Sequence, residues 1–164
     1  MRAVVLGIGN PVLTDDSVGL AVARHFAGRP DVVTEMLTTT GFDVLGKILG
    51  FDRAVIVDGI RSGRRPGTVL ELEPGDLGGG AFSGTHNLGL GATLAMGYRF
   101  FAGEMPAQIR IVAVEVADTT TFGTVCTAAV AAAVPEAVAA VRRWLDRQTG
   151  GGQEETGGLA FSAS

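Results

Sequence analysis

Short apolar runs that end at a glycine or an acid recur along the chain and predict buried strands. Such runs occupy residues 3–7, 53–59 and 108–116, and the run at 53–59 has four apolar residues followed by an acid and a glycine. Residues 31–37 alternate in the way of a further strand. The segment 67–73 is different because apolar and acidic side chains alternate along it. That alternation is typical of a half-exposed strand at the edge of a sheet. We therefore predict about five strands.

Between the predicted strands, apolar residues recur at the spacing of an α-helix. Helices are predicted for residues 15–28, 41–50, 86–101 and 126–148. The faces expected to be buried carry Val18, Val22 and Phe26 in the first helix, Phe42, Leu45, Ile48 and Leu49 in the second, and Leu90, Leu94 and Tyr98 in the third. Pro135 is expected to kink the last helix or to start a second one.

The order of these elements predicts a doubly wound α/β domain with a mostly parallel sheet. Segment 67–73 would be an antiparallel edge strand after a tight turn at 61–67. Residues 74–85 contain five glycines and are expected to form a flexible loop. We predict one domain over residues 1–148, followed by a disordered glycine-rich tail at 149–164 that lacks periodicity.

Composition and charge narrow the class of protein. Hydrophobic residues make up 46% of the 164 and charged residues 18%, a balance typical of a compact globular protein. The formal net charge is −4 and no stripe of Lys and Arg is present, so we expect no nucleic-acid partner. Because Cys126 is the single cysteine, an intrachain disulfide and a CxxC metal site are excluded, which fits a reducing, cytoplasmic location. No apolar run approaches the roughly 18 residues of a membrane span, and no signal peptide is visible.

In a doubly wound sheet, ligands bind beyond the carboxyl ends of the parallel strands. The polar residues expected at that edge are Asn10, Asp15 and Asp16 after the first strand, the segment 38–41 after the second, Asp58, Glu115 and Asp118 at the ends of later strands, and His86. Carboxylates crowded in a dry crevice are destabilised unless a cation or a shared proton relieves them. Asp16, Asp58 and His86 together offer two hard oxygens and one imidazole, which suits a first-row divalent ion. On this chemistry, nickel, zinc, iron and manganese are all allowed.

Each of these residues also has a simpler structural interpretation. Asp15 is expected to be a helix N-cap, and Asp16 is equally compatible with stabilising a helix dipole and with a functional role. Asp58 could cap a turn before Gly59, and His86 could be an ordinary histidine at the start of a helix. Only Asp16, Asp58 and His86 taken together indicate a metal site.

Other candidate motifs are interpreted as structural. A dinucleotide-binding GxGxxG turn after the first strand is excluded, because Val12 stands in place of the last glycine. His25 is expected at the surface of the first helix, and Cys126 is expected to be a small buried thiol. Glu115 and Asp118 are expected to face water.

Several stretches of the chain resemble the hydrogenase maturation endopeptidases. They are "MRAVVLGIGNPVLTDDSVG", "AVIVDGI", "HNLGL", and "IRIVAVEV" with "FGTVCTAAVAAAVPEAVAAV", in the family's order over about residues 1–147. The resemblance implies a three-layer α/β fold with helices on both faces of a twisted sheet. It also implies an endopeptidase that removes a C-terminal extension from the large subunit of a [NiFe] hydrogenase once nickel has been inserted. By this resemblance, Asp16, Asp58 and His86 match the family's metal-binding residues.

Two positions depart from the family's pattern. Ser17 follows Asp16 where members often have glycine or alanine, a change that keeps the ligand. Thr38 stands after the second strand where many members carry an acid, and a threonine hydroxyl cannot act as a carboxylate base or ligand. A hydrolysis that needed that acid would be slow, differently specialised, or dependent on Asp16 and Asp58.

The resemblance leads to a specific functional hypothesis. The chain would be an endopeptidase for a nickel-loaded large-subunit precursor, with Asp16 and Asp58 as catalytic acids. Nickel belonging to the substrate would be held by Asp16, Asp58 and His86, and the hydrolytic base is either a carboxylate or a metal-bound water. A metal-dependent docking module that does not cut the precursor is the alternative, kept open by Thr38. A small-molecule-binding α/β protein whose acids merely cap helices is a third possibility.

Overall fold

The computed structural model describes residues 1–39, 41–78 and 87–147 and contains a five-stranded sheet in the order β2-β1-β3-β5-β4. The strands are β1 (Ala3–Ile8), β2 (Val32–Leu37), β3 (Arg53–Ile60), β4 (Val69–Leu72) and β5 (Gln108–Glu115). β1 pairs in parallel with β2 and β3, β3 pairs in parallel with β5, and β4 lies antiparallel to β5 at one edge. The predicted mostly parallel sheet with an antiparallel edge is therefore confirmed. The tail expected at 149–164 lies outside the described residues.

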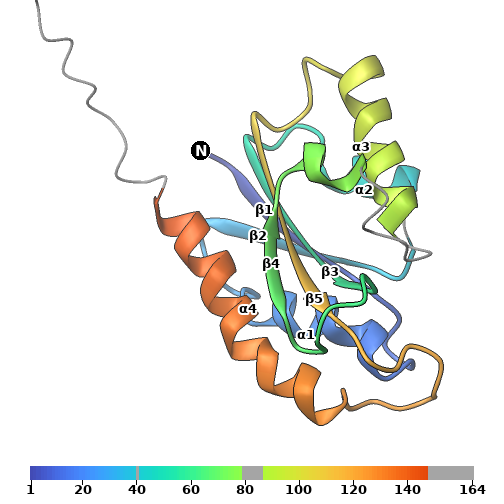
Figure 1. The fold of residues 1–164 in the computed structure, drawn as a ribbon. Coiled ribbons are helices and arrows are strands. Elements are labelled where there is room, and N and C mark those ends of the chain that lie inside the picture. The colour runs from blue at the N-terminus through green and yellow to red at the C-terminus, as the bar shows by residue number, and fades with distance from the viewer. Residues whose placement is uncertain (40, 79–86, 148–164) are drawn as a thin grey trace, which may run out of the picture.

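Helices cover both faces of the sheet and make the fold three-layered. They are the 3-10 turns η1 (Asp15–Ser17) and η2 (Pro74–Gly78), and the helices α1 (Val18–Arg24), α2 (Phe42–Ile48), α3 (Asn87–Phe100) and α4 (Ala128–Arg147). Figure 1 shows α1 and α4 on one face of the sheet and α2 and α3 on the other. Of the helices in the described part of the chain, none is long and apolar enough to span a membrane.

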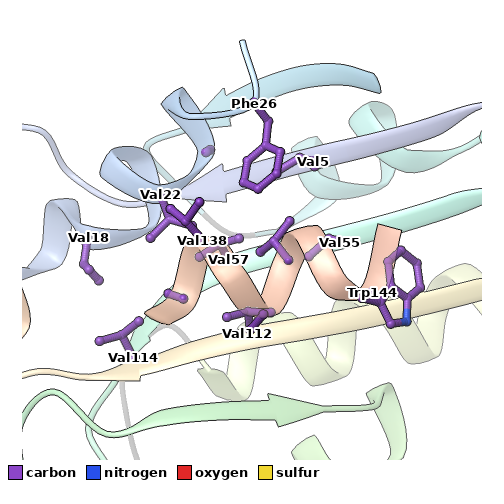
Figure 2. Close-up of a cluster of buried hydrophobic side chains, with 14 of the residues drawn as sticks. Val5, Val18, Val22, Phe26, Val55, Val57, Val112, Val114, Val138 and Trp144 are labelled. Atoms are coloured by element: carbon purple, nitrogen blue, oxygen red, sulfur yellow. The ribbon is translucent and has the colours of Figure 1, made fainter. Parts of the chain in front are cut away.

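Two apolar clusters fill the space between the layers. On the face covered by α1 and α4, Val5, Val57 and Val112 of the sheet pack with Val22 of α1 and Val138 of α4 (Figure 2). The cluster under α2 and α3 takes the alternate strand residues and includes Val4, Leu6, Ile56, Ile111, Val44, Leu45, Leu90 and Leu94. Because both faces are covered, β1 and β3 are buried along nearly their whole length, which explains their almost continuously apolar sequences.

Two residues expected in the core lie largely at the surface instead. Phe42 is 67% exposed as the first residue of α2, and Tyr98 is 44% exposed near the end of α3. On α3 the buried face passes through Gly97 rather than Tyr98, since a Cβ at Gly97 would lie 2.6 Å from the Met105 sulfur and 2.7 Å from Leu45 Cδ2. Helical spacing alone did not reveal that a glycine allows this close contact.

Two segments are more regular than the sequence suggested. α4 runs through Pro135 as one helix, so the predicted second start is wrong. Pro135 removes the helical donor of the Ala131 carbonyl, but both residues lie on the exposed side of α4, where water can bind that carbonyl. Residues 74–78 form η2, and its Leu77 is buried in the core, so this part of the expected flexible loop is ordered by packing. The remainder of that expected loop lies outside the described residues.

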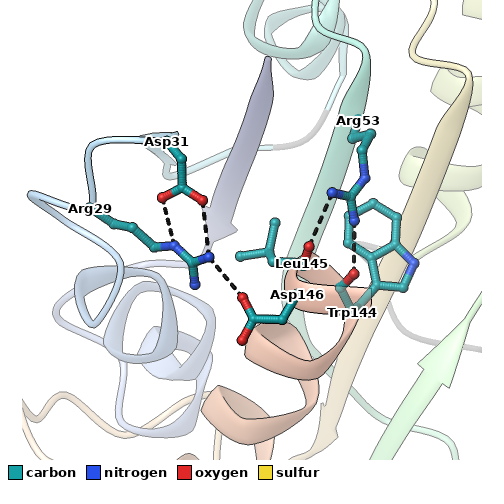
Figure 3. A network of polar contacts seen from close by, with 6 residues as sticks. All are labelled: Arg29, Asp31, Arg53, Trp144, Leu145 and Asp146. Carbon is teal, nitrogen blue, oxygen red and sulfur yellow. Dashed lines mark hydrogen bonds and ion pairs between the residues drawn. The ribbon is translucent and has the colours of Figure 1, made fainter. Parts of the chain in front are cut away.

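Two arginines hold the last turn of α4 against the sheet (Figure 3). Arg53, at the start of β3, is 4% exposed and donates to the carbonyls of Trp144 at 2.7 Å and Leu145 at 3.2 Å. These carbonyls have no helical donor because the helix ends at Arg147. The Arg53 guanidinium also lies 4.3 Å from the centre of the Trp144 ring.

Arg29 forms ion pairs with Asp31 and Asp146 on the outside of the same turn, and its side chain is 27% exposed.

Replacing Arg53 by methionine should destabilise the protein by about 2–3 kcal/mol, because two buried carbonyls lose a charged donor and Trp144 loses its stacked cation. Arg29→Gln is the matched control, and its partly exposed ion pairs should contribute no more than about 1 kcal/mol. Urea denaturation followed by circular dichroism measures both free energies of unfolding. Equal losses in the two variants would contradict the role assigned to Arg53.

Candidate functional site

Three glycines let η1 and α1 lie directly on the sheet. A Cβ at Gly7 would stand 2.6 Å from the carbonyl oxygen of Gly19, and a Cβ at Gly9 would collide with the carbonyl oxygen of Asp16. A Cβ at Gly19 would collide in turn with the carbonyl oxygens of Ile8 in β1 and of Val57 in β3. The glycines after the first strand therefore serve close packing. This packing brings the two aspartates that begin η1 to the carboxyl edge of the sheet.

The Asp15 carboxylate ties the loop after β1 to the loop after β5. It is fully buried and accepts hydrogen bonds from the backbone N–H groups of Ala117 at 2.9 Å, Asp118 at 2.8 Å and Thr127 at 2.7 Å. The Thr127 hydroxyl donates to it as well. The expected N-cap role is wrong, since neither η1 nor α1 has a side-chain cap hydrogen bond. Asp15 is a buried cross-link between two loops, and nothing in its position in the sequence signalled those distant donors.

Asp16 and Asp58 form a buried pair of acids at this edge. Asp16 is 6% exposed, and its Oδ2 accepts a hydrogen bond from the Asn10 N–H at 2.9 Å. Asp58, near the end of β3, is 3% exposed, and its Oδ2 has no hydrogen-bond partner among the described residues. Asp58 alternates in phase with Ala54 and Ile56, so it lies on the face of the sheet covered by α2 and α3.

Burial raises the pKa of the Asp58 carboxyl well above its ordinary value. The neighbouring charge of Asp16 raises the pKa of Asp58 further, and a hydrogen bond from the Gly59 backbone lowers it. An ionised Asp58 is thus destabilised by desolvation and by like charge. A proton or a cation at the Asp58 carboxylate would relieve this cost.

The described residues cover only two members of the predicted metal site. His86 lies outside them; α3, which begins at the next residue, covers the face of the sheet that carries Asp58. Within residues 1–39, 41–78 and 87–147, no group of three or more His, Cys, Asp or Glu side chains is arranged to hold a metal. The structure brings Asp16 and Asp58 together, and the role of these two residues and of His86 as metal ligands stays a prediction.

Glu115 is buried instead of facing water, which corrects the expectation for this residue. It is 2% exposed and accepts hydrogen bonds from the Ser62 N–H at 2.9 Å, the Ser62 hydroxyl at 2.6 Å and the Gly63 N–H at 3.1 Å. It therefore fixes the turn that follows β3. Asp118 is half-exposed, and its carboxylate accepts from the N–H groups of Thr120 and Thr121.

The remaining candidates are structural or lie at the surface. Cys126 is half-buried rather than fully buried, its sulfur lies 3.7 Å from the Ser17 hydroxyl, and burial raises the pKa of the thiol. His25 is exposed at the end of α1, as expected. Thr38 is exposed just beyond β2. Neither Ser17 nor Cys126 has a histidine partner among the described residues.

The fold and the site define a small three-layer α/β protein with a buried acidic pair at the carboxyl edge of its sheet. The family model for hydrogenase maturation proteases matches residues 27–144 of the chain. The chain is 34% identical over 123 residues to the hydrogenase 2 maturation protease of Escherichia coli strain K12, covering 70% of this chain and 73% of that protein. The chain therefore belongs to the hydrogenase maturation protease family.

Solved structures agree with this membership. The hydrogenase maturating endopeptidase HybD from E. coli superposes with a TM-score of 0.75 at 28% identity, covering 92% of this chain and 94% of that one. A solution structure of an endopeptidase from Escherichia coli gives a TM-score of 0.77 at 29% identity, with the same coverage of 92% and 94%. The [NiFe] hydrogenase maturation protease HybD from Thermococcus kodakarensis shares the fold, with a TM-score of 0.71 at 22% identity, covering 88% of this chain and 99% of that one.

Replacing Asp15 by asparagine should destabilise the protein by about 2–4 kcal/mol, because an amide NH2 would face donors that now bind a carboxylate oxygen. Asp118→Asn is the control, since an amide oxygen can still accept from Thr120 and Thr121 at this half-exposed turn, and it should lose less than about 1 kcal/mol. Thermal and urea denaturation compare the two variants. A loss for Asp15→Asn no larger than that for Asp118→Asn would contradict the cross-link.

Replacing Asp58 by asparagine should instead stabilise the metal-free protein at pH 7. The pKa of Asp58 is raised above its unfolded value of 3.8, so the folded state binds more protons and stability falls as the pH rises through that window. Asparagine removes the charge, and each kcal/mol gained raises Tm by about 2–4 °C in a chain of this size. Differential scanning calorimetry in a chelator should show that the gain shrinks below pH 3.8, where Asp58 is protonated in both states. A lower Tm for Asp58→Asn at pH 7 would contradict this account.

Proposed function

We propose that the chain is an endopeptidase that removes a C-terminal extension from the nickel-loaded precursor of a [NiFe] hydrogenase large subunit. Membership of the hydrogenase maturation protease family supports the class of reaction and of substrate. The observation that carries the proposal is the buried Oδ2 of Asp58, which has no hydrogen-bond partner among the described residues and lies beside a second buried acid, Asp16. Such a pair is set up to receive a cation that arrives with the substrate.

The nickel of the precursor would be recognised by Asp16, Asp58 and His86. Two carboxylates and an imidazole suit a divalent first-row ion and leave positions for ligands from the substrate. The ion neutralises the like charges of the aspartates, so a loaded precursor binds more tightly than an empty one. Metal loading thereby becomes the condition for cleavage, because differential binding excludes a precursor that lacks nickel.

Hydrolysis requires a water activated next to the scissile carbonyl. Either a water on the metal, with its pKa lowered, or one of the carboxylates of Asp16 and Asp58 takes the proton. The buried position of both acids keeps competing bulk water away from them. Ser17 donates its hydroxyl hydrogen to the Thr14 carbonyl at 2.8 Å, which supports a water rather than a serine as the nucleophile.

Asp16→Asn, Asp58→Asn and His86→Ala should each lower kcat/KM for cleavage of the nickel-loaded precursor by at least about 100-fold, because each removes a ligand of the metal-bearing substrate. His25→Ala is the matched control: it removes the other histidine of the chain, which is exposed directly after α1, and should leave cleavage within about twofold. Mass spectrometry of the precursor follows the reaction with and without nickel.

Undiminished cleavage by all three site variants would refute the proposal, and so would equally fast cleavage of nickel-free precursor. A wild-type protein that binds loaded precursor tightly but never shortens it would be a docking module. Thr38 supports that alternative, because this exposed position beyond β2 carries no carboxylate. Intact mass measurement separates the two functions directly, since only an enzyme changes the mass of the precursor.

A further inference from the structure

Exposed apolar side chains stand on two loops beside the acidic pair. Val12 is 48% exposed on the loop after β1, and Phe122 and Val125 are 81% and 74% exposed on the loop after β5. These two loops lie side by side at the lower right of Figure 1. Val12, Phe122 and Val125 form what we call the apolar rim. Exposed aromatic and aliphatic groups gathered in this way mark interaction sites more often than isolated ones do.

Hydrogen bonds hold the apolar rim in place. Leu13 and Phe122 form an antiparallel β-bridge, and the Gly123 N–H donates to the Val12 carbonyl at 2.9 Å. The Thr14 N–H donates to the Thr121 carbonyl at 3.1 Å, and its hydroxyl donates to the same carbonyl at 2.6 Å. The rim is thus presented on a fixed backbone. A partner that binds there does not have to order these loops, which lowers the entropy cost of docking.

A cluster of positive charge follows β3 at the same edge of the sheet. Arg61, Arg64 and Arg65 lie on the turn whose backbone the buried Glu115 fixes, and we call them the basic loop. Arg61 donates to the Thr119 hydroxyl at 2.9 Å, which joins the basic loop to the loop that carries Phe122. In the part of the chain that the structure describes, no acid pairs with Arg61 or Arg65, although the whole chain has a net charge of −4.

We propose that the apolar rim and the basic loop bind an extended segment of the precursor that carries apolar and acidic side chains, and hold it beside Asp16 and Asp58. The inference rests on the proposed function, and it names the surface that selects the protein substrate. The acidic pair repels a segment rich in carboxylates, whereas the basic loop attracts it, so the two charges fix its direction across the edge of the sheet. Phe122 supplies the apolar anchor.

The test measures cleavage kinetics on nickel-loaded precursor and the Kd for nickel-free precursor, which the protein should leave uncut. Phe122→Ser should raise both KM and Kd by about tenfold, and Arg61→Gln with Arg65→Gln by about fivefold, while kcat stays within about twofold. The double arginine variant should also show a smaller increase of Kd between 50 and 300 mM salt. Salt weakens attraction between exposed charges, because the Debye length is only about 8–10 Å near 0.1–0.15 M, and the variant has fewer such charges to screen.

Matched controls lie at the opposite end of the sheet. Phe100→Ser changes a phenylalanine that is 64% exposed at the end of α3, and Arg142→Gln with Arg147→Gln removes two exposed charges from the last turns of α4. Both controls should keep KM and Kd within about twofold of the wild type. Thermal melts of every variant identify any that fail to fold.

Unchanged KM and Kd in the rim and loop variants would overturn the inference while leaving the proposed function intact. The same holds if Phe122→Ser only converts a dimer to a monomer in size-exclusion chromatography, since the rim would then contact a second copy of the chain. If the wild type never shortens the precursor, the proposed function fails. The Kd series then still decides whether this surface docks the precursor.

Discussion

The close approach of η1 and α1 to the sheet is the constraint on which the rest of the structure depends. Gly7, Gly9 and Gly19 remove the side chains that would keep the two layers apart, so backbone meets backbone where β1 ends. At that point the adjacent residues Asp15 and Asp16 have different roles. Asp15 binds the loop after β5 with its whole carboxylate, and Asp16 is placed beside Asp58. One tight contact therefore supplies both the scaffold and the site.

The two neighbouring acids illustrate how the surroundings decide what a carboxylate does. Asp15 is surrounded by N–H and O–H donors, which satisfy its carboxylate oxygens and make it part of the framework. Asp58 is equally buried but lacks a partner for Oδ2 among the described residues, so its charge is a cost to the fold. Buried groups that weaken a fold are typical of sites that await a ligand. An ionised Asp58 therefore weakens the fold in the absence of a bound cation.

Much of the fold could be predicted from the sequence, because it depends on patterns that act locally. Apolar runs gave the buried strands, and the alternating run gave the antiparallel edge strand β4. The predicted roles of two acids failed because they depend on distant contacts. Asp15 was expected to cap its own helix, but its backbone donors lie 102, 103 and 112 residues further along the chain. Glu115 was expected to face water, and its partners in the turn after β3 are equally invisible to a local pattern.

The candidate site, like the fold, could be predicted from the sequence only in part. The rule that ligands bind at the carboxyl ends of parallel strands selected Asp16 and Asp58, and the structure brings them together. The sequence could not reveal why Gly7 and Gly9 precede the two aspartates. The same Gly-x-Gly sequence fits both a dinucleotide-binding turn, which was excluded, and the close contact between layers that the structure has. The exposed position of Phe122 was also hidden, since it depends on a bridge to Leu13 across the two loops.

The parallel pairing of β1 with β3 has a consequence for when the protein can act. Gly7 stands opposite Val57, so residues 8–56, which include β2 and α2, are synthesised between the two partners. Long-range pairing of this kind forms late and slowly compared with a hairpin. A chain in which this pairing has not yet formed therefore carries Asp16 and Asp58 without bringing their carboxylates together.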